Sequence, residues 1–386
     1  MRSRRALILA SAGIAATALT LSACSSSGNG GGGNTGGNTG GNTGASTPSS
    51  GGGGVQVGVI LPDTTSSTRY TLYDQPLLQA AFDAAGIKSD IQNAGGSTSK
   101  QASIADSMIG EGVKVILIDS IDATSGAAIE QKADAAGIKV IDYDRVNLGG
   151  TAGFYVSFDN EKVGELQAQT LIDCLNADNV TNPQIIEMDG GKDVDNNAVL
   201  FAKGAATVFD QAQSAGKLTV VSKTTVPGWD KNKAAGLFQQ ALTANGGKVD
   251  GVLAANDDIA NEVITVLQNK GLAGKVPVTG QDAGIGGLQN ILKGDQCMTV
   301  FKDVKQEADA AAKLAIALIQ GDDPSSVGKL QAFEDPQSAS HHIQALLLTP
   351  QVITKDNVED VVTAGALKAS DICQGIQSLC DAAGVK

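Results

Sequence analysis

The chain has 386 residues, with 28 lysines and arginines against 41 aspartates and glutamates and a formal net charge of −13. So acidic a chain argues against nucleic acid and anionic membrane surfaces as partners. Its length is sufficient for two lobes of ordinary domain size.

The first 24 residues have the pattern of an export signal. Arg2, Arg4 and Arg5 precede an apolar run, Ala6–Leu21, that is too short to favour a membrane span. The run ends in "LSAC", whose small residues before Cys24 resemble the lipobox of bacterial lipoproteins. We therefore expect an exported protein that is lipid-anchored through Cys24 at the outer face of the cell membrane, or periplasmic. A plain signal peptide with an incidental cysteine is the alternative.

Residues 25–54 consist almost entirely of Gly, Ser, Asn and Thr and contain the repeated string "GGNT". Such a segment cannot bury apolar surface, so we expect a disordered linker. About 30 residues of this kind span a root-mean-square distance of roughly 30 Å. The linker would hold a folded protein near a membrane without fixing its orientation.

From residue 55 onward, short apolar strands alternate with amphipathic helices. Val55–Leu61 is an apolar run bounded by Pro62 and predicts the first strand. A helix pattern follows and stops at Gly86. Further strands are expected at residues 113–118 and 138–143, with helices between them. This order predicts a parallel sheet with helices on both faces.

A second series of strands and helices begins after residues 154–158. Its strands are expected at 184–188, 218–221, 251–254, 276–279 and 298–301. The predicted fold class is therefore α/β, with two doubly wound lobes of parallel strands. Ligands of such sheets bind beyond the carboxyl ends of the strands.

Polar and charged side chains with single aromatics follow these strand ends. They are Asp63, Arg69, Tyr70, Asp144 and Arg145, and the segments "DVDNN" (193–197), "PGWD" (227–230), "AANDD" (254–258), "GQDA" (280–283) and "FKD" (301–303). No loop is uniformly basic, as a phosphate site would require. Carboxylates and amides accept hydrogen bonds from sugar hydroxyls, Arg and Lys donate them, and aromatic faces cover the ring. The pattern therefore favours a neutral sugar, with the glycines of "GQDA" allowing a tight turn that presents Asp282.

Single residues of this set have simpler explanations. Asn256 and Asp282 could be helix N-caps, Trp229 a packing residue and Arg145 the partner of a surface ion pair. Capping, however, explains neither the cations nor the aromatic residue at the same edge. A polar cleft with aromatic walls accounts for all of them together.

Other chemistries lack their motifs. "DVDNN" begins like a calcium loop, but Ala198 and Gly204 stand where that loop needs Gly and Glu. "GIGGLQN" has Gln289 in place of the third dinucleotide-binding glycine. We expect no metal, no cofactor and no catalysis. A glycosidase acting through Asp195 and Asp282 is the enzyme alternative.

Several segments resemble the periplasmic sugar-binding proteins of type I fold, in particular those that bind D-xylose. They are "FYVSFDNEKVGELQAQTL" (154–171), "VDNNAVLF", "ALTANGGKVDGVLAANDD", "GLAGKVPVTGQDA" and "MTVFK". The resemblance covers nearly all of residues 55–360 and implies two lobes joined by a three-crossing hinge. Its expected boundaries are 55–158 plus 303–343 for one lobe and 159–302 plus 344–386 for the other.

The resemblance also implies the site residues. The sugar contacts would be Arg69, Asp144, Arg145, Asp195, Asn197, Trp229, Asn256, Asp282 and Lys302. The loop "TTSSTRY" departs from the pattern, because it is one residue longer and has Tyr70 where those proteins have Trp. We include Tyr70 in the expected site, and its presence leaves the identity of the sugar open.

The resemblance further implies partners. It predicts a monomer that captures D-xylose between its lobes and delivers it to an ABC importer, whose permease and ATPase subunits are separate chains. The alternative is a sensor that presents another aldose, such as glucose, arabinose or galactose, to a membrane receptor.

Four cysteines remain once Cys24 is assigned to the lipid. Cys373 and Cys380 are close enough in sequence for a local bridge, and Cys174 then pairs with Cys297 by elimination. Four free thiols are the alternative.

Overall fold

The computed structural model describes residues 54–386. The expected signal segment, Cys24 and nearly all of the expected linker lie outside this range. No helix in residues 54–386 is long and apolar enough to cross a membrane.

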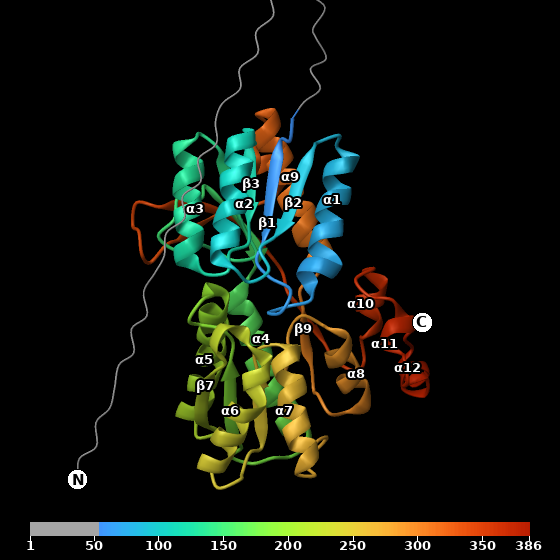
Figure 1. Ribbon diagram of the computed structural model, residues 1–386. Coiled ribbons are helices and arrows are strands. Elements are labelled where there is room, and N and C mark those ends of the chain that lie inside the picture. The colour runs from blue at the N-terminus through green and yellow to red at the C-terminus, as the bar shows by residue number, and fades with distance from the viewer. Residues whose placement is uncertain (1–53) are drawn as a thin grey trace, which may run out of the picture. The chain divides into compact units, whose positions relative to one another are not determined.

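The N-terminal lobe is built on one seven-stranded sheet of strand order β10-β11-β5-β4-β3-β1-β2. Figure 1 labels three of its strands, β1, β2 and β3. Its strands are β1 (Val57–Leu61), β2 (Ser89–Asn93), β3 (Val115–Ile118), β4 (Lys139–Tyr143), β5 (Phe154–Phe158), β10 (Gln331–Glu334) and β11 (His342–Leu348). All neighbours are parallel except β10 and β11. The expected parallel sheet is thus confirmed, with one antiparallel strand added at its edge.

Helices cover both faces of this sheet, because alternate residues of each buried strand point to opposite sides. Val59 and Leu61 pack on the side of α1 (Gln75–Ala84) and α9 (Val304–Gln320). Ile60, between them, packs with α2 (Thr98–Glu111) and α3 (Ala123–Ala135). The lobe also contains the short helices η1 (Tyr70–Asp74) and η3 (Pro324–Val327).

The C-terminal lobe has a three-stranded parallel sheet of order β7-β6-β8. The strands are β6 (Gln184–Asp189), β7 (Thr219–Thr225) and β8 (Gly251–Ala254). Its helices are α4 (Asn160–Ala177), α5 (Asn196–Ser214), η2 (Pro227–Trp229), α6 (Lys231–Ala244), α7 (Asp257–Asn269) and α8 (Ile285–Lys293).

Two expectations for this lobe are wrong in detail. Residues 276–279 form no regular strand and make only an isolated parallel bridge, between Val252 and Val278. Pro277 lies in this run and has no backbone N–H to donate to a ladder. β9 (Thr299–Phe301) is not part of the β7-β6-β8 sheet and instead pairs antiparallel with β12 (Gln351–Ile353) in a separate two-stranded sheet.

The chain passes from one sheet system to the other after β5, after β9 and after β11. The third passage lies later than the expected boundary at 343/344. β11 stays in parallel register with β5 up to the pair Leu348 and Phe158, so it belongs to the N-terminal sheet as far as Leu348. The chain then enters β12 at Gln351.

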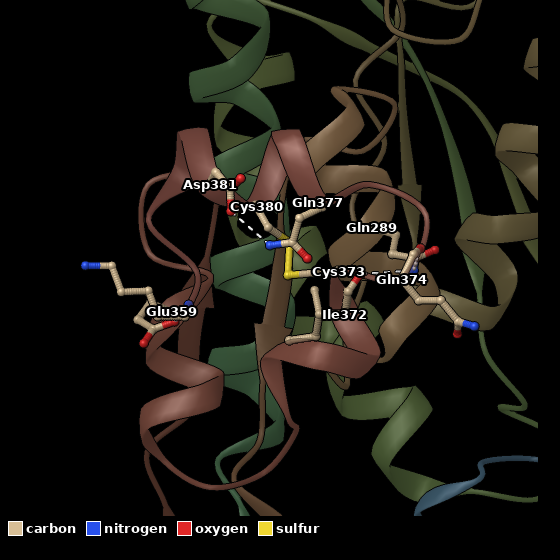
Figure 2. Close-up of a disulfide and its surroundings, with 9 residues drawn as sticks. Gln289, Glu359, Ile372, Cys373, Gln374, Gln377, Cys380 and Asp381 are labelled. Atoms are coloured by element: carbon tan, nitrogen blue, oxygen red, sulfur yellow. Dashed lines mark hydrogen bonds between the residues drawn. A yellow bond between two sulfur atoms is a disulfide. The ribbon is translucent and has the colours of Figure 1, made fainter.

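The last residues form three short helices that pack on α8. They are α10 (Glu359–Thr363), α11 (Ala369–Ile372) and α12 (Gln377–Ala383). Their apolar side chains share a buried cluster with Leu288 and Ile291 of α8. A disulfide joins Cys373 to Cys380, with Cα atoms 5.8 Å apart (Figure 2). A second disulfide joins Cys174 of α4 to Cys297, just before β9.

Candidate functional site

All ten residues expected from the sequence line one cavity of about 30 Å³ between the two lobes. They lie at or just after the carboxyl ends of strands, or in the passages between lobes, as the parallel topology requires. Four further residues complete the lining, namely Ser66, Ser67, Phe201 and Gln281. The cavity is therefore walled by polar and charged groups from both lobes.

Arg69 is buried and contacts three carboxylates. Its Nε and Nη2 donate to the two oxygens of Asp74 at 2.9 and 2.8 Å. Its Nη1 donates to Asp144 Oδ1 at 3.1 Å, and its Nη2 also donates to Glu307. Burial opposes the charge of the guanidinium, but these carboxylates outweigh burial and raise the pKa of Arg69 further above its usual range. The side chain is thus fixed as a permanent cation on the cavity wall.

Arg145 links the two lobes. Its Nη2 donates to Tyr70 Oη at 3.1 Å and its Nη1 to the Ser120 carbonyl at 3.2 Å. Its Nε lies 3.5 Å from Asp119 Oδ1 in the same lobe and 3.4 Å from Asp195 Oδ2 in the other. The expected alternative of a surface ion pair is wrong, because Arg145 is buried.

Asp119 is a supporting residue that the sequence analysis missed. It is fully buried, and neither carboxylate oxygen has a hydrogen-bond partner among the described residues. Burial raises the pKa of Asp119 well above its usual range, against the opposing charge of Arg145. Asp119 directly follows β3 as Asp144 directly follows β4, so its position at a strand end was a usable signal.

Asp144 supplies both its carboxylate and its carbonyl to the site. Lys302 Nζ lies 3.9 Å from Asp144 Oδ1. The Asp144 carbonyl accepts from Asn197 Nδ2 of the other lobe at 2.8 Å. Burial alone would raise the pKa of Asp144, but Arg69, Lys302 and Arg145 lower it below its usual value. The carboxylate is therefore a charged acceptor on the cavity wall.

Trp229 both packs and lines the cavity. Its ring meets Phe201 edge to face with centroids 6.4 Å apart, and its Nε1 donates to Asp195 Oδ2 at 3.0 Å. A Cβ at Gly190 would overlap the ring, so this position requires glycine. The packing alternative for Trp229 is thus correct, and the residue also contributes the aromatic wall.

The N-cap alternative holds for Asn256 and fails for Asp282. Asn256 Oδ1 accepts from Ile259 N at 2.9 Å and caps α7. The N-cap of α8 is instead Gly284, without a side-chain bond. Asp282 Oδ1 lies 3.5 Å from Lys302 Nζ, so the Asp282 side chain is directed to the cavity.

The "GQDA" turn uses its glycine differently from our expectation. The left-handed backbone falls on Asp282 (φ 88°) and Ala283 (φ 50°). Gly280 has no positive φ and instead allows the close approach of Asp257, which a Cβ would overlap. Asp144 (φ 59°) and Trp229 (φ 58°) are also left-handed. Backbone strain of this kind is concentrated at functional sites.

The arrangement suits reversible binding of a neutral, hydroxyl-rich molecule. Carboxylates accept, guanidinium and ammonium groups donate, and each such bond is charge-assisted. In residues 54–386, no group of three or more His, Cys, Asp or Glu side chains is placed to hold a metal ion.

Comparison with known proteins assigns the chain to a family. Residues 57–323 match the family described as periplasmic binding protein domain. The chain belongs to this family of periplasmic binding proteins. It is 36% identical to the D-xylose-binding periplasmic protein of Escherichia coli (strain K12) over 300 residues, which cover 78% of this chain and 87% of that protein. It is 33% identical to the multiple sugar-binding periplasmic receptor ChvE of Rhizobium radiobacter, over 82% of this chain and 91% of that protein.

Solved structures give the same assignment. A carbohydrate transporter solute binding protein from Chloroflexus aurantiacus, in complex with D-glucose, superposes with a TM-score of 0.73 at 30% identity, covering 82% of this chain and 97% of that one. The resemblance and the type I periplasmic binding protein fold are therefore confirmed. The protein is an exported or periplasmic sugar-binding protein of ABC transporters. Because the family consists of solute-binding proteins that are not enzymes, the glycosidase alternative is set aside.

Some residues at the site gave no usable signal in the sequence. Phe201 and Glu307 lie inside α5 and α9, away from any strand end. Gln281 belongs to the "GQDA" segment (280–283), but nothing in the sequence marked its side chain as part of the site. Phe201 lines the cavity and Glu307 contacts Arg69 only through the packing of α5 and α9.

Proposed function

We propose that this periplasmic binding protein captures D-xylose between its lobes and delivers it to an ABC importer. The observation that carries the proposal is that all ten expected sugar contacts line a single cavity. The similarity to D-xylose-binding periplasmic proteins of two organisms, at 36% identity each, supports the choice of sugar.

Binding and lobe closure are coupled through the residues that face one another across the cavity. Arg145 and Asp144 of one lobe contact Asp195 and Asn197 of the other. The cavity of about 30 Å³ is close to the volume of one water molecule. A pyranose therefore needs the lobes to separate, and it then replaces these interlobe contacts with bonds to its own hydroxyls. Bonding to both lobes favours the closed state, which the transporter recognises.

Another aldose is the second candidate, with the protein acting as a sensor for a membrane receptor. The observation that favours it is Tyr70, whose hydroxyl is engaged by Arg145 and whose ring faces Arg69 and Arg145 at 5.6 and 5.8 Å from their Cζ atoms. Because two cations contact this ring, it offers less free apolar surface to a sugar ring than an uncontacted Trp side chain would. One relative is a multiple sugar-binding receptor, and one solved structure contains D-glucose.

We further propose that the protein is a lipid-anchored monomer. The "LSAC" site and the long polar segment after it support a tether through Cys24. The ligand site is complete within one chain, since both walls of the cavity come from the same molecule.

Calorimetric titration with D-xylose, D-glucose, L-arabinose and D-galactose tests the proposal. We expect D-xylose to bind most tightly, and Asp195→Ala to weaken that binding. Asp210→Ala is the control, because Asp210 is exposed on α5 and lies outside the cavity. Preference for another sugar would favour the second candidate, and no binding of any aldose would overturn both.

A further inference from the structure

A second, larger cavity opens directly beside the sugar cavity. It has a volume of about 750 Å³. The two share five lining residues, namely Ser67, Arg69, Asn256, Asp282 and Lys302. We call the larger cavity the outer groove. A ligand group attached to a sugar at Asp282 and Lys302 would therefore lie next to the outer groove.

The outer groove is mainly apolar and has walls from both lobes. Leu72 of η1 and Ile285 of α8 line it and are 58% and 38% exposed. Among residues 54–386 only one other large hydrophobic side chain is exposed, Val199 of α5, and it lies outside the groove. Tyr73 and Leu77 extend the wall of the N-terminal lobe. Exposed apolar side chains that converge on one cavity indicate a binding surface.

The third wall is the C-terminal segment, which contributes Val361, Leu367 and Lys368. This segment lies beyond residue 323, where the family match ends. It is held firmly against α8: Gln289 Nε2 donates to the Ile372 carbonyl at 3.0 Å, and the Cys373–Cys380 disulfide closes the turn that follows (Figure 2). These contacts hold this wall of the groove in place.

We propose that the outer groove binds the apolar aglycone of a glycoside whose sugar occupies the inner cavity. The inference rests on the proposed sugar-binding function and extends it from free monosaccharides to sugar conjugates. Sites for small organic ligands are typically 300–1,000 Å³ in volume and apolar, with a few polar groups that fix orientation. The outer groove has this size, and its lining combines apolar side chains with polar ones, five of which it shares with the sugar cavity. The groove therefore matches an apolar substituent on a polar ring that the shared residues hold once the lobes have closed on it.

The test compares glycosides that differ only in the size of the aglycone. The full exported chain in lipid nanodiscs is titrated with D-xylose, and with the methyl and phenyl D-xylosides of both anomers. We expect the phenyl xyloside of one anomer to bind at least about tenfold more tightly than its methyl counterpart, because the phenyl ring buries more apolar surface. Leu72→Gln combined with Ile285→Gln should abolish this advantage.

Val199→Gln is the matched control, since it replaces an exposed apolar side chain outside the groove by the same polar one. It should leave the tighter binding of the phenyl xyloside unchanged. Unaltered affinity for free D-xylose shows that the variants are folded. If D-xylose binds but no phenyl xyloside binds more tightly than its methyl counterpart, the groove proposal is overturned and the proposed function stands. If D-xylose fails to bind, the groove proposal is tested with the methyl and phenyl glycosides of D-glucose, L-arabinose and D-galactose. Tighter binding of a phenyl glycoside than of its methyl counterpart would then support the groove proposal, although D-xylose is not the ligand. No such difference would overturn the groove proposal together with the choice of D-xylose.

Discussion

Arg145 Nε lies 3.4 Å from Asp195 Oδ2 across the interlobe cavity and 3.5 Å from Asp119 Oδ1 within its own lobe. The same guanidinium therefore contacts the opposite lobe and also neutralises a buried carboxylate in its own lobe. Removal of one member of a buried charge pair leaves the other uncompensated.

Arg145→Ala should therefore weaken the unliganded protein as well as sugar binding. We expect the free energy of unfolding to fall by about 3–5 kcal/mol at pH 8. The loss should be smaller at pH 5, because burial already raises the pKa of Asp119 and the carboxyl takes up a proton once Arg145 is gone. Urea denaturation at the two pH values measures this difference. Adding Asp119→Asn to Arg145→Ala should restore much of the stability but not the affinity; unchanged stability in the single variant would contradict the pairing.

Glu307 gives the fold a pH dependence of defined sign. Burial raises the pKa of this carboxyl from 4.5 to about 8, although Arg69 and Lys302 oppose the shift. In the unfolded chain Glu307 ionises above about pH 4.5, whereas in the folded chain it stays protonated up to about pH 8. Its contribution to stability is thus fully present below pH 4.5 and is lost as pH rises through this window.

Glu307→Gln should remove this dependence. The variant has no proton to lose, so its stability relative to the wild type should increase from pH 5 to pH 8, by an amount on the order of a few kcal/mol at most. Denaturant titrations at several pH values provide the measurement. Glu165→Gln on α4, where the side chain is partly exposed and paired with Lys162, is the control. A constant difference across the range would show that Glu307 is already ionised in the folded protein.

The parts of the fold that could be predicted are those encoded locally. Apolar runs such as Val57–Leu61 are buried strands, and polar residues after them meet at one edge because parallel strands align their carboxyl ends. This argument and the resemblance together named all ten candidate lining residues. The cap alternative for Asp282 stayed open in the sequence, and only the structure shows that Gly284 takes that position.

The parts that could not be predicted depend on contacts between distant segments. β11 joins β5 across more than 180 residues, so the residue at which that register ends depends on the pairing of the two strands. Residues 276–279 have strand composition, but Pro277 leaves them only a single bridge. The wall formed by residues 361–371 arises from packing on α8, which no local pattern reveals.

Cys24 is expected to carry the lipid anchor. Cys24→Ser should yield protein that is released or retained as an unprocessed precursor, because the acylated residue is lost. Metabolic labelling with a fatty-acid analogue measures acylation directly. Label that persists in the variant would contradict the lipobox, and Cys24 is the only cysteine of the chain before Cys174, so the labelled peptide is easily assigned.

The Cys373–Cys380 disulfide should stabilise the C-terminal segment rather than the whole protein. The loop it closes is short, and chain-entropy arguments give about 2–3 kcal/mol for such a loop. Replacing both cysteines by serine should increase hydrogen exchange in residues 359–386 while the two sheets remain protected. Mass mapping of unreduced peptides from the wild type checks the bridge itself. Free thiols at both positions would contradict it.

Asp282 offers the sharpest separation between a binding role and a structural one. It caps no helix, its side chain is 24% exposed, and its only ion-pair partner among residues 54–386 is Lys302 at 3.5 Å. Asp282→Ala should therefore cost about 2–4 kcal/mol in sugar binding, a loss of roughly 30-fold to 1,000-fold, because a charged acceptor is removed and its sugar donor is left unpaired. The melting temperature of the unliganded protein should change little.

Asp282→Asn is the control for the backbone, since Asn accepts the left-handed conformation that this position adopts at φ 88° more readily than Ala does. Both variants should lose affinity, and neither should lower the melting temperature by more than the small strain that Ala adds at this φ. Calorimetric titration beside thermal melts of each variant makes the comparison. Affinity close to that of the wild type in both variants would place Asp282 outside the ligand site. A fall in melting temperature shared by both, with affinity preserved, would instead assign it a structural role in the turn before α8.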